Sequence, residues 1–132
     1  MSLTSNLVRD DALSVTDVGV ELALRLPWFR SLPVSCVGNL ALTIDGRTAL
    51  PDQVRIRIGD RELEVGELAD RHEFEWFVLD ELTVALPMDS PPERGSVVSV
   101  TLDLDVRIPD ILIGPETALT YHHHVERDLI AL

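Results

Sequence analysis

Apolar and polar residues alternate with a period of two along most of the chain. The longest run places apolar residues at every second position of residues 98–108, namely Val98, Val100, Leu102, Leu104, Val106 and Ile108. Strict alternation over this length is typical of a β-strand with one face in the core and the other in water. Five shorter stretches predict further strands at residues 20–26, 40–44, 54–58, 63–65 and 82–86, and an aromatic stretch predicts another at 74–79.

Turn residues separate these strands at short spacing. Asp45-Gly46 and Gly59-Asp60 each lie between two apolar runs and predict type I′ hairpins, and Pro91-Pro92 with Gly95 predicts a longer loop. Parallel strands need crossovers of about a dozen residues, and the sequence has no such segment. Residues 1–132 are therefore predicted to form one all-β domain, an antiparallel sandwich of about eight or nine strands. Helix is expected only as one turn at 65–71 and, weakly, in the tail at 125–132.

Composition and charge narrow the possible functions. The chain has 132 residues and a net charge of −12, so it should repel nucleic acids and anionic membranes. All 11 basic residues are arginine, which excludes a lysine nucleophile and a P-loop. Cys36 is the only cysteine, and neither a secretory leader nor a membrane-spanning run is recognisable, so we expect a cytoplasmic protein.

Residues 27–33 (PWFRSLP) interrupt the alternation directly after the strand at 20–26. One interpretation is a corner of the sandwich in which Trp28 fills one end of the core. The other, which we favour, is a partner-binding surface, because Trp and Arg are enriched at interface hot spots and a proline-stiffened loop loses little entropy on docking. The predicted interface residues are Pro27, Trp28, Phe29, Arg30, Ser31, Leu32 and Pro33.

The same segment resembles a known family. Residues 25–35 (RLPWFRSLPVS) resemble the RLPWYRSLPLS stretch of the small (β) subunit of bacterial C-glycoside deglycosidases. Residues 42–46 (LTIDG) are similar to the TVDG hairpin of that family, and Trp76 followed by Leu79-Asp80 is similar to its W-xx-D stretch. The chain departs from the pattern at Phe29, where the family usually has Tyr, and at Asp110, where an aromatic residue is expected.

The resemblance implies an immunoglobulin-like β-sandwich that assembles with a larger TIM-barrel α subunit. In this family the α subunit holds a divalent metal, typically manganese, and the catalytic His base. The complex cleaves the carbon–carbon bond between a 3-oxo-sugar and an aromatic aglycone such as a flavonoid. The resemblance therefore implies a non-catalytic chain that binds no metal or cofactor itself and meets the 3-oxo-C-glycoside through the complex.

The histidines are the residues of this chain that could form a metal site of its own. The histidines are His72, His122, His123 and His124, and an extended chain would place His122 and His124 on one face with Glu126. Two His on one face can chelate a metal, but a solvated polar strand is the favoured interpretation.

The paired carboxylates and the single cysteine are not expected to be catalytic. Adjacent Asp80 and Glu81 point to opposite faces of a strand, and Asp103 and Asp105 should share the face that meets water, so neither pair suits acid–base catalysis. Cys36 lacks a nearby His and is expected to be a small buried residue.

Two other functions remain as alternatives. A stand-alone carbohydrate- or aromatic-ligand-binding sandwich would use Trp28 and Trp76 as stacking platforms, although only 5% of the residues are aromatic. An immunoglobulin-like adhesion domain would normally carry a disulfide and a secretory signal, so it is the least favoured.

Overall fold

The computed structural model describes residues 7–28, 31–49, 51–71, 75–77 and 80–132, and its regular structure is almost entirely β-strand. The strands are β1 (Val8–Val15), β2 (Gly19–Arg25), β3 (Leu32–Pro33), β4 (Val37–Ile44), β5 (Arg47–Thr48), β6 (Arg55–Ile58), β7 (Arg61–Glu64), β8 (Glu75–Trp76), β9 (Glu81–Pro87), β10 (Val97–Leu112) and β11 (Ala118–Ile130). Short 3-10 helices lie at η2 (Val34–Cys36), η3 (Pro51–Gln53) and η4 (Val65–Asp70). Eight of these strands have four or more residues, which matches the predicted number, and β3, β5 and β8 have two residues each.

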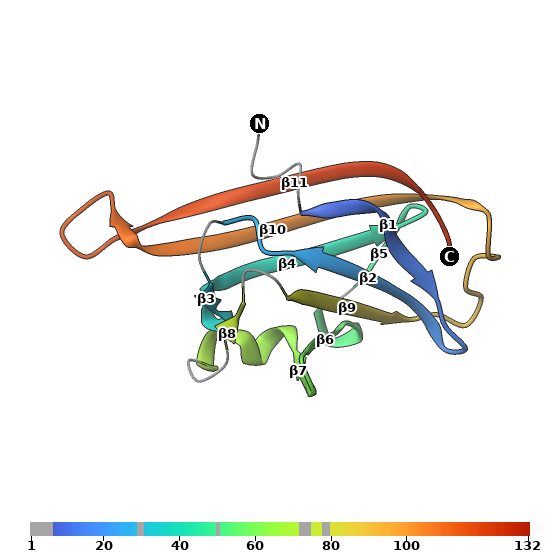
Figure 1. Ribbon diagram of the computed structural model, residues 1–132, viewed down its shortest axis with the longest axis horizontal. Coiled ribbons are helices and arrows are strands. Elements are labelled where there is room, and N and C mark those ends of the chain that lie inside the picture. Colours follow the sequence, from blue (N-terminus) through green and yellow to red (C-terminus); the bar gives the residue numbers. More distant parts are fainter. Residues whose placement is uncertain (1–6, 29–30, 50, 72–74, 78–79) are drawn as a thin grey trace.

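The longer strands form two antiparallel sheets. One sheet has the order β1-β2-β9-β6-β7 and the other has the order β11-β10-β4-β5. Figure 1 shows these sheets as two layers, and their inward side chains form one continuous core. A third, two-stranded sheet pairs β3 with β8 at one end of the layers. The predicted all-β antiparallel sandwich is confirmed.

Strand β10 shows how the sequence pattern produces this core. It pairs with β4 on one side and with β11 on the other, so it lies inside its sheet. Its six alternate apolar residues, Val98 to Ile108, are each at most 1% exposed. The polar residues between them point to the outer face, as the period of two requires.

The turns follow backbone stereochemistry with one difference from expectation. Asp45 and Gly46 have φ of 49° and 82°, and two positive φ values are what a type I′ turn needs. At the second turn Gly59 has φ of 58°, whereas Asp60 is not among the described residues with positive φ. The predicted type I′ turn at Gly59-Asp60 is therefore wrong, and the glycine in first position gives the φ pattern of type II′.

The helix predictions had mixed outcomes. The turn expected at 65–71 is η4, and its start is capped by the backbone N–H of Glu64 donating to Glu67 Oε1 at 3.2 Å. The helix expected at 125–132 is wrong, because β11 continues to Ile130 and pairs residue by residue with β10 up to Val97. Pairing along a long neighbouring strand outweighs a weak local helical preference. No helix in the described part of the chain has the length and apolar character to cross a membrane.

Hydrogen bonds between β1 and the C-terminal residues join the two sheets along one side. The guanidinium of Arg127 on β11 donates to the Val8 carbonyl oxygen at 2.5 Å and also contacts the carboxylate of Asp10. The backbone N–H of Leu132 donates to the Leu13 oxygen at 3.1 Å, and the N–H of Val15 donates to the Leu132 oxygen at 2.8 Å. We call these contacts the edge clasp.

The β10–β11 hairpin extends beyond the rest of the sandwich. Pairing of β10 with β4 ends at Val106, and Ile108 is the last residue of β10 described as buried, whereas Ile111 and Leu112 are exposed. Beyond Ile108, residues 109–118 form a ribbon closed by the Ile113 N–H donating to the Thr117 oxygen at 2.9 Å. Figure 1 shows this closed end projecting past the other strands, and we call residues 109–118 the arm.

Candidate partner interface

Of residues 27–33, the described ones, 27–28 and 31–33, lie at the end of the sandwich from which the arm projects (Figure 1). Pro27 and Leu32 are buried within the chain, so they fix the segment to the fold. Trp28, Ser31 and Pro33 are half-buried and are the described residues left to meet a partner. Phe29 and Arg30, which the sequence also assigned to the interface, lie outside the described residues.

Trp28 begins a row of rings that crosses from one sheet to the other. It packs against the core on one side, and its ring centroid lies 5.9 Å from that of Tyr121 at an interplanar angle of 43°. The Tyr121 ring in turn stacks on His123, with centroids 6.0 Å apart. Offset and tilted ring pairs at these distances are favourable. The row connects the 27–33 segment to β11, which the sequence alone did not predict.

Trp76 does not serve as a stacking platform. It is 1% exposed, and its indole N–H donates to the Asp80 carbonyl oxygen at 3.0 Å. Trp76 pairs with Leu32 across the β3–β8 sheet, so the packing of Trp76 in the core holds β3 in place. The alternative function, a ligand-binding sandwich that stacks sugars or aromatic ligands on Trp28 and Trp76, loses one of its two platforms, because a residue that fills the core cannot also face a ligand.

Phe77 is an exposed aromatic residue that the sequence prediction did not single out. It directly follows β8 and is 54% exposed. Continuing the antiparallel register of Leu32 with Trp76 places it opposite Ser31. The strand period could have revealed it, since Trp76 and Phe77 must face opposite ways and only one can be in the core. We therefore add Phe77 to the candidate interface.

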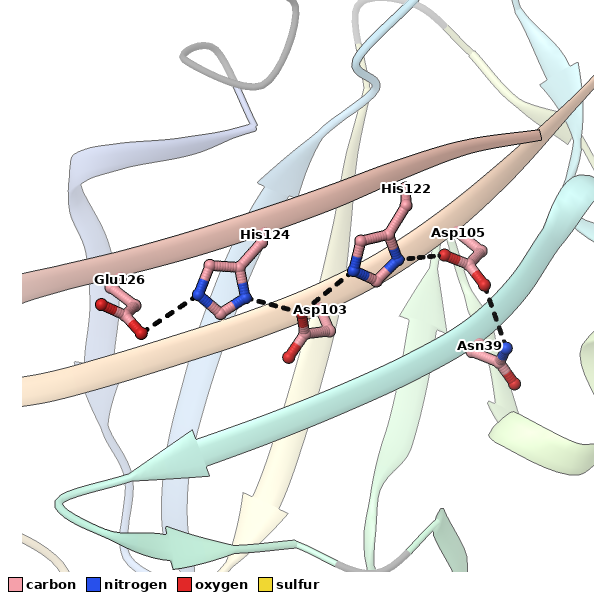
Figure 2. A network of polar contacts seen from close by, with 6 residues as sticks. All are labelled: Asn39, Asp103, Asp105, His122, His124 and Glu126. Atoms are coloured by element: carbon pink, nitrogen blue, oxygen red, sulfur yellow. Dashed lines mark hydrogen bonds and ion pairs between the residues drawn. The ribbon is translucent and has the colours of Figure 1, made fainter. Parts of the chain in front are cut away.

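A ladder of polar side chains covers the outer face of β4, β10 and β11 (Figure 2). Asp103 pairs with His124 and Asp105 with His122 across the two strands. His122 Nδ1 lies 2.5 Å from Asp105 Oδ1, and His124 Nδ1 lies 2.6 Å from Asp103 Oδ1.

Further contacts join the two His–Asp pairs to each other and extend the ladder at both ends. His122 Nε2 is 3.3 Å from Asp103 Oδ1, and His124 Nε2 is 3.1 Å from Glu126 Oε1. The side-chain amide of Asn39, on β4, donates to Asp105 Oδ2 at 3.0 Å. The two His and the two Asp each share one outward face, as predicted, but the sequence did not predict that these residues face each other.

Charge pairing in the ladder shifts its titration. Hydrogen bonding to Asp105 raises the pKa of His122, and hydrogen bonding to Asp103 and Glu126 raises the pKa of His124. The same bond from His122 lowers the pKa of Asp105. His123 faces the core between them, and burial lowers its pKa. The sequence HHH therefore contains two outward histidines that favour the charged form and one inward histidine that favours the neutral form.

The ladder does not have the arrangement of a metal site. Each of the four ring nitrogens of His122 and His124 lies beside a carboxylate oxygen. Within the described ranges, no group of three or more His, Cys, Asp or Glu side chains is arranged to hold a metal ion.

The remaining candidate groups lie where they serve the fold or face solvent. Cys36 is 2% exposed in the core, as predicted. Asp80 and Glu81 are both exposed, with Asp80 accepting the Trp76 hydrogen bond through its backbone. Neither feature supplies an acid–base pair across a cleft.

Comparison with known proteins gives consistent matches. The model of the C-glycoside deglycosidase beta subunit family matches residues 3–110. A C-glycoside deglycosidase beta subunit of Arthrobacter globiformis is 28% identical over 130 residues, which cover 98% of each chain. A 3′-dehydrocarminate deglycosidase beta subunit of Microbacterium sp. is 38% identical over 103 residues, which cover 78% of this chain and 76% of that protein. A second C-glycoside deglycosidase beta subunit from the same Arthrobacter strain is 32% identical over 113 residues, 83% of each chain.

Fold and surface together define a class: an all-β sandwich whose described residues offer an aromatic surface at one end and no cluster of metal ligands. The family match covers most of the chain, and the relatives align over nearly all or most of their own length. The chain belongs to the C-glycoside deglycosidase beta subunit family.

Proposed function

We propose that this chain is the non-catalytic beta subunit of a heteromeric C-glycoside deglycosidase in the cytoplasm. Its partner is a TIM-barrel alpha subunit that carries the catalytic base and a divalent metal, manganese by the family resemblance. The observation that carries the proposal is the match to beta subunits over nearly the full chain. A beta subunit implies an assembly with another chain, and the aromatic surface around Trp28 and Phe77 offers a place for that contact.

The proposed reaction is a β-elimination on a 3-oxo-C-glycoside with an aromatic, flavonoid-type aglycone. A C-glycoside has no bridging oxygen to protonate, so the usual pair of carboxylates cannot release the aglycone. A ketone at C3 makes the C2 proton acidic, so that a base of the partner subunit would remove it, and a divalent metal held by that subunit would supply Lewis-acid stabilisation of the negative charge that develops. The electron pair from the C2–H bond forms the C1=C2 double bond, the C1–aryl bond breaks, and the aryl carbon takes a proton. One relative is named for a 3′-dehydro compound, which supports an oxidised sugar as substrate.

The contribution of this chain is to bind and order the partner. The two His nearest to forming a base or ligand set, His122 and His124, already contact carboxylates through all four ring nitrogens. The segment at residues 27–33 contains two prolines that restrict its backbone, and its Leu32 pairs with the buried Trp76. A rigid surface of this kind loses little entropy on docking and can hold loops of the partner in place.

The test is reconstitution. The chain is expressed with a sugar-isomerase-like TIM-barrel subunit from the same genome, and the mixture is separated by gel filtration with Mn²⁺ present. We expect a complex that converts a 3-oxo-C-glucoside to free aglycone, with activity in neither separated subunit fraction alone. The proposal would be contradicted if the two chains did not associate, or if the TIM-barrel chain were fully active without this one.

The ligand-binding alternative is less well supported. It required two exposed tryptophan platforms, and Trp76 is in the core. Binding of free glucose or an aromatic glycoside to the isolated chain, measured by titration calorimetry, would be the result that favours it.

A further inference from the structure

The arm exposes three consecutive apolar residues. Ile111, Leu112 and Ile113 are 37%, 60% and 66% exposed, although such residues are normally kept in the core. Ile111 and Leu112 are the last two residues of β10, so their side chains point to opposite faces, and Ile113 follows in the bend that closes the arm. Runs of three exposed apolar residues are unfavourable in water unless they serve a function. Because each face of the arm carries an exposed apolar residue, the arm suits a groove that surrounds it better than a flat surface.

The arm gains little stability from the chain that carries it. Within the described part of the chain its strands pair only with each other, since β10 leaves β4 after Val106, and their pairing shifts register between Ile108 and Leu112. An isolated two-stranded ribbon is marginally stable in water. The sandwich core is complete at Ile108, which is 1% exposed, so the arm does not fill the core.

The arm is continuous with the candidate partner interface. Tyr121 lies on β11 a few residues from the arm and pairs with Val106 at its base. Its ring meets Trp28 at a centroid distance of 5.9 Å, so Trp28 lies beside the part of β11 that follows the arm. Figure 1 shows β3 and β8 at the same end of the molecule as the arm. The family match ends at residue 110, so it assigns no role to the arm's apolar residues.

We propose that the arm inserts into an apolar groove of the partner alpha subunit and forms a second contact beside the Trp28 surface. This inference rests on the proposed function, because it needs a partner subunit. A second copy of this chain is a poorer occupant, since two chains of net charge −12 repel each other. An anionic membrane is disfavoured for the same reason.

The experiment compares matched charge substitutions in the arm and at the opposite end of the β10–β11 hairpin. Ile113→Asp changes the arm, and Val97→Asp changes an equally exposed valine at the opposite end of the hairpin, both residues being 66% exposed. Affinity for the purified alpha subunit is measured by titration calorimetry, and thermal unfolding of each free variant is measured alongside. Ile113→Asp is expected to weaken association at least about tenfold, whereas Val97→Asp leaves it near wild type. A double variant, Ile111→Ser with Ile113→Ser, repeats the test without adding charge.

Each remaining outcome overturns the proposal. Equal affinities of the arm variants and Val97→Asp would show that the arm does not bind the partner, while wild-type assembly leaves the proposed function intact. A melting temperature lowered only by the arm variants would show that the arm supports the fold. A wild-type chain that self-associates in sedimentation, and becomes monomeric with Ile113→Asp, would identify a second copy as the occupant. Absence of any association in the wild type would remove the proposed function as well.

Discussion

Trp28 is half-buried: it packs against the core and against the ring of Tyr121, and it is partly exposed to solvent. This position combines the two interpretations of the sequence, a residue that fills one end of the core and a residue that meets a partner. The half-buried position means that truncating Trp28 removes only part of a core contact. Its ring lies next to that of Tyr121, close to where the partner is proposed to dock.

We therefore expect Trp28→Ala to weaken association with the alpha subunit by roughly 30-fold, the loss typical of a central interface tryptophan. Trp76→Ala is the matched control, because Trp76 is 1% exposed and should lose about 3–5 kcal/mol of folding stability. Thermal unfolding and binding are measured for both variants. If Trp28→Ala unfolds as early as Trp76→Ala, residue 28 serves the core and the interface assignment fails.

The polar ladder gives the outer face a pH-dependent stability. The pKa of His122 is raised, so its contribution is present below the ordinary histidine pKa of about 6.5 and is lost as pH rises through the folded value. The pKa of Asp105 is lowered, so its contribution is present above the ordinary value of about 3.9 and is lost as pH falls through the folded value. The pair stabilises the fold most between these two limits.

Replacing both outward histidines should therefore matter more in mild acid than in base. The variant His122→Gln with His124→Gln is expected to melt slightly below wild type at about pH 5.5 and close to it at about pH 8.5. The difference stays small because these side chains are exposed and water screens their charges. Melting curves across this range check it, and a deficit that grows toward high pH would contradict the assigned ion pairs.

At the scale of the strand, β2 and β9 approach each other closely at Gly19. A Cβ added at Gly19 would lie 2.1 Å from the Leu86 carbonyl oxygen and 2.8 Å from the Met88 nitrogen, both backbone atoms that cannot turn away. Gly19→Ala is expected to destabilise the fold by about 1–3 kcal/mol through forced displacement of β9.

The control for this substitution lies in η4. A Cβ at Gly66 meets nothing within 4 Å, so Gly66→Ala should be neutral or slightly stabilising. Urea unfolding at constant temperature compares the two variants. Similar midpoints for both would show that the β2–β9 edge has room that the structure does not contain.

Strands with unbroken alternation were predictable from the sequence, and those with interruptions were not. β10 and β9 were predicted because alternate apolar residues fall on one buried face. β1 was missed because its register against β2 shifts between Val8 and Leu13, which breaks the period of two. β11 was only partly predicted, since five of its thirteen paired partners on β10 are polar and the sequence of a single strand does not reveal which strand it will pair with.

The candidate interface shows the same division. The motif at 27–33 stood out because it broke the alternation, but burial of Pro27 and Leu32 depends on packing that no local pattern contains. Tyr121 and the arm are over 80 residues from Trp28 in sequence, so only the folded chain brings them together. The His–carboxylate ladder likewise required the β10–β11 register before its members could be paired.

For the molecule as a whole, the expectation is that catalysis needs the partner. We predict that the isolated chain releases no aglycone from a 3-oxo-C-glucoside, with or without added Mn²⁺. The reason is that neither the ladder nor any other group in the described part of the chain combines a base with a metal-ligand set. Product formation is followed by liquid chromatography, and turnover by the chain alone that is lost on chelation would refute the prediction.

The edge clasp has a consequence for the time course of folding. Arg127 and Val8 are separated by 119 residues, so their contact requires closure of nearly the longest loop the chain can form. Because closing so long a loop is entropically costly, we expect the local hairpins to assemble first and this contact to form after the rate-limiting step. Arg127→Ala should then leave the folding limb of a chevron plot unchanged and speed unfolding, whereas a slower folding limb would place the clasp in the nucleus. The edge clasp would then control the unfolding rate, and so the lifetime, of the native sandwich without changing how fast it forms.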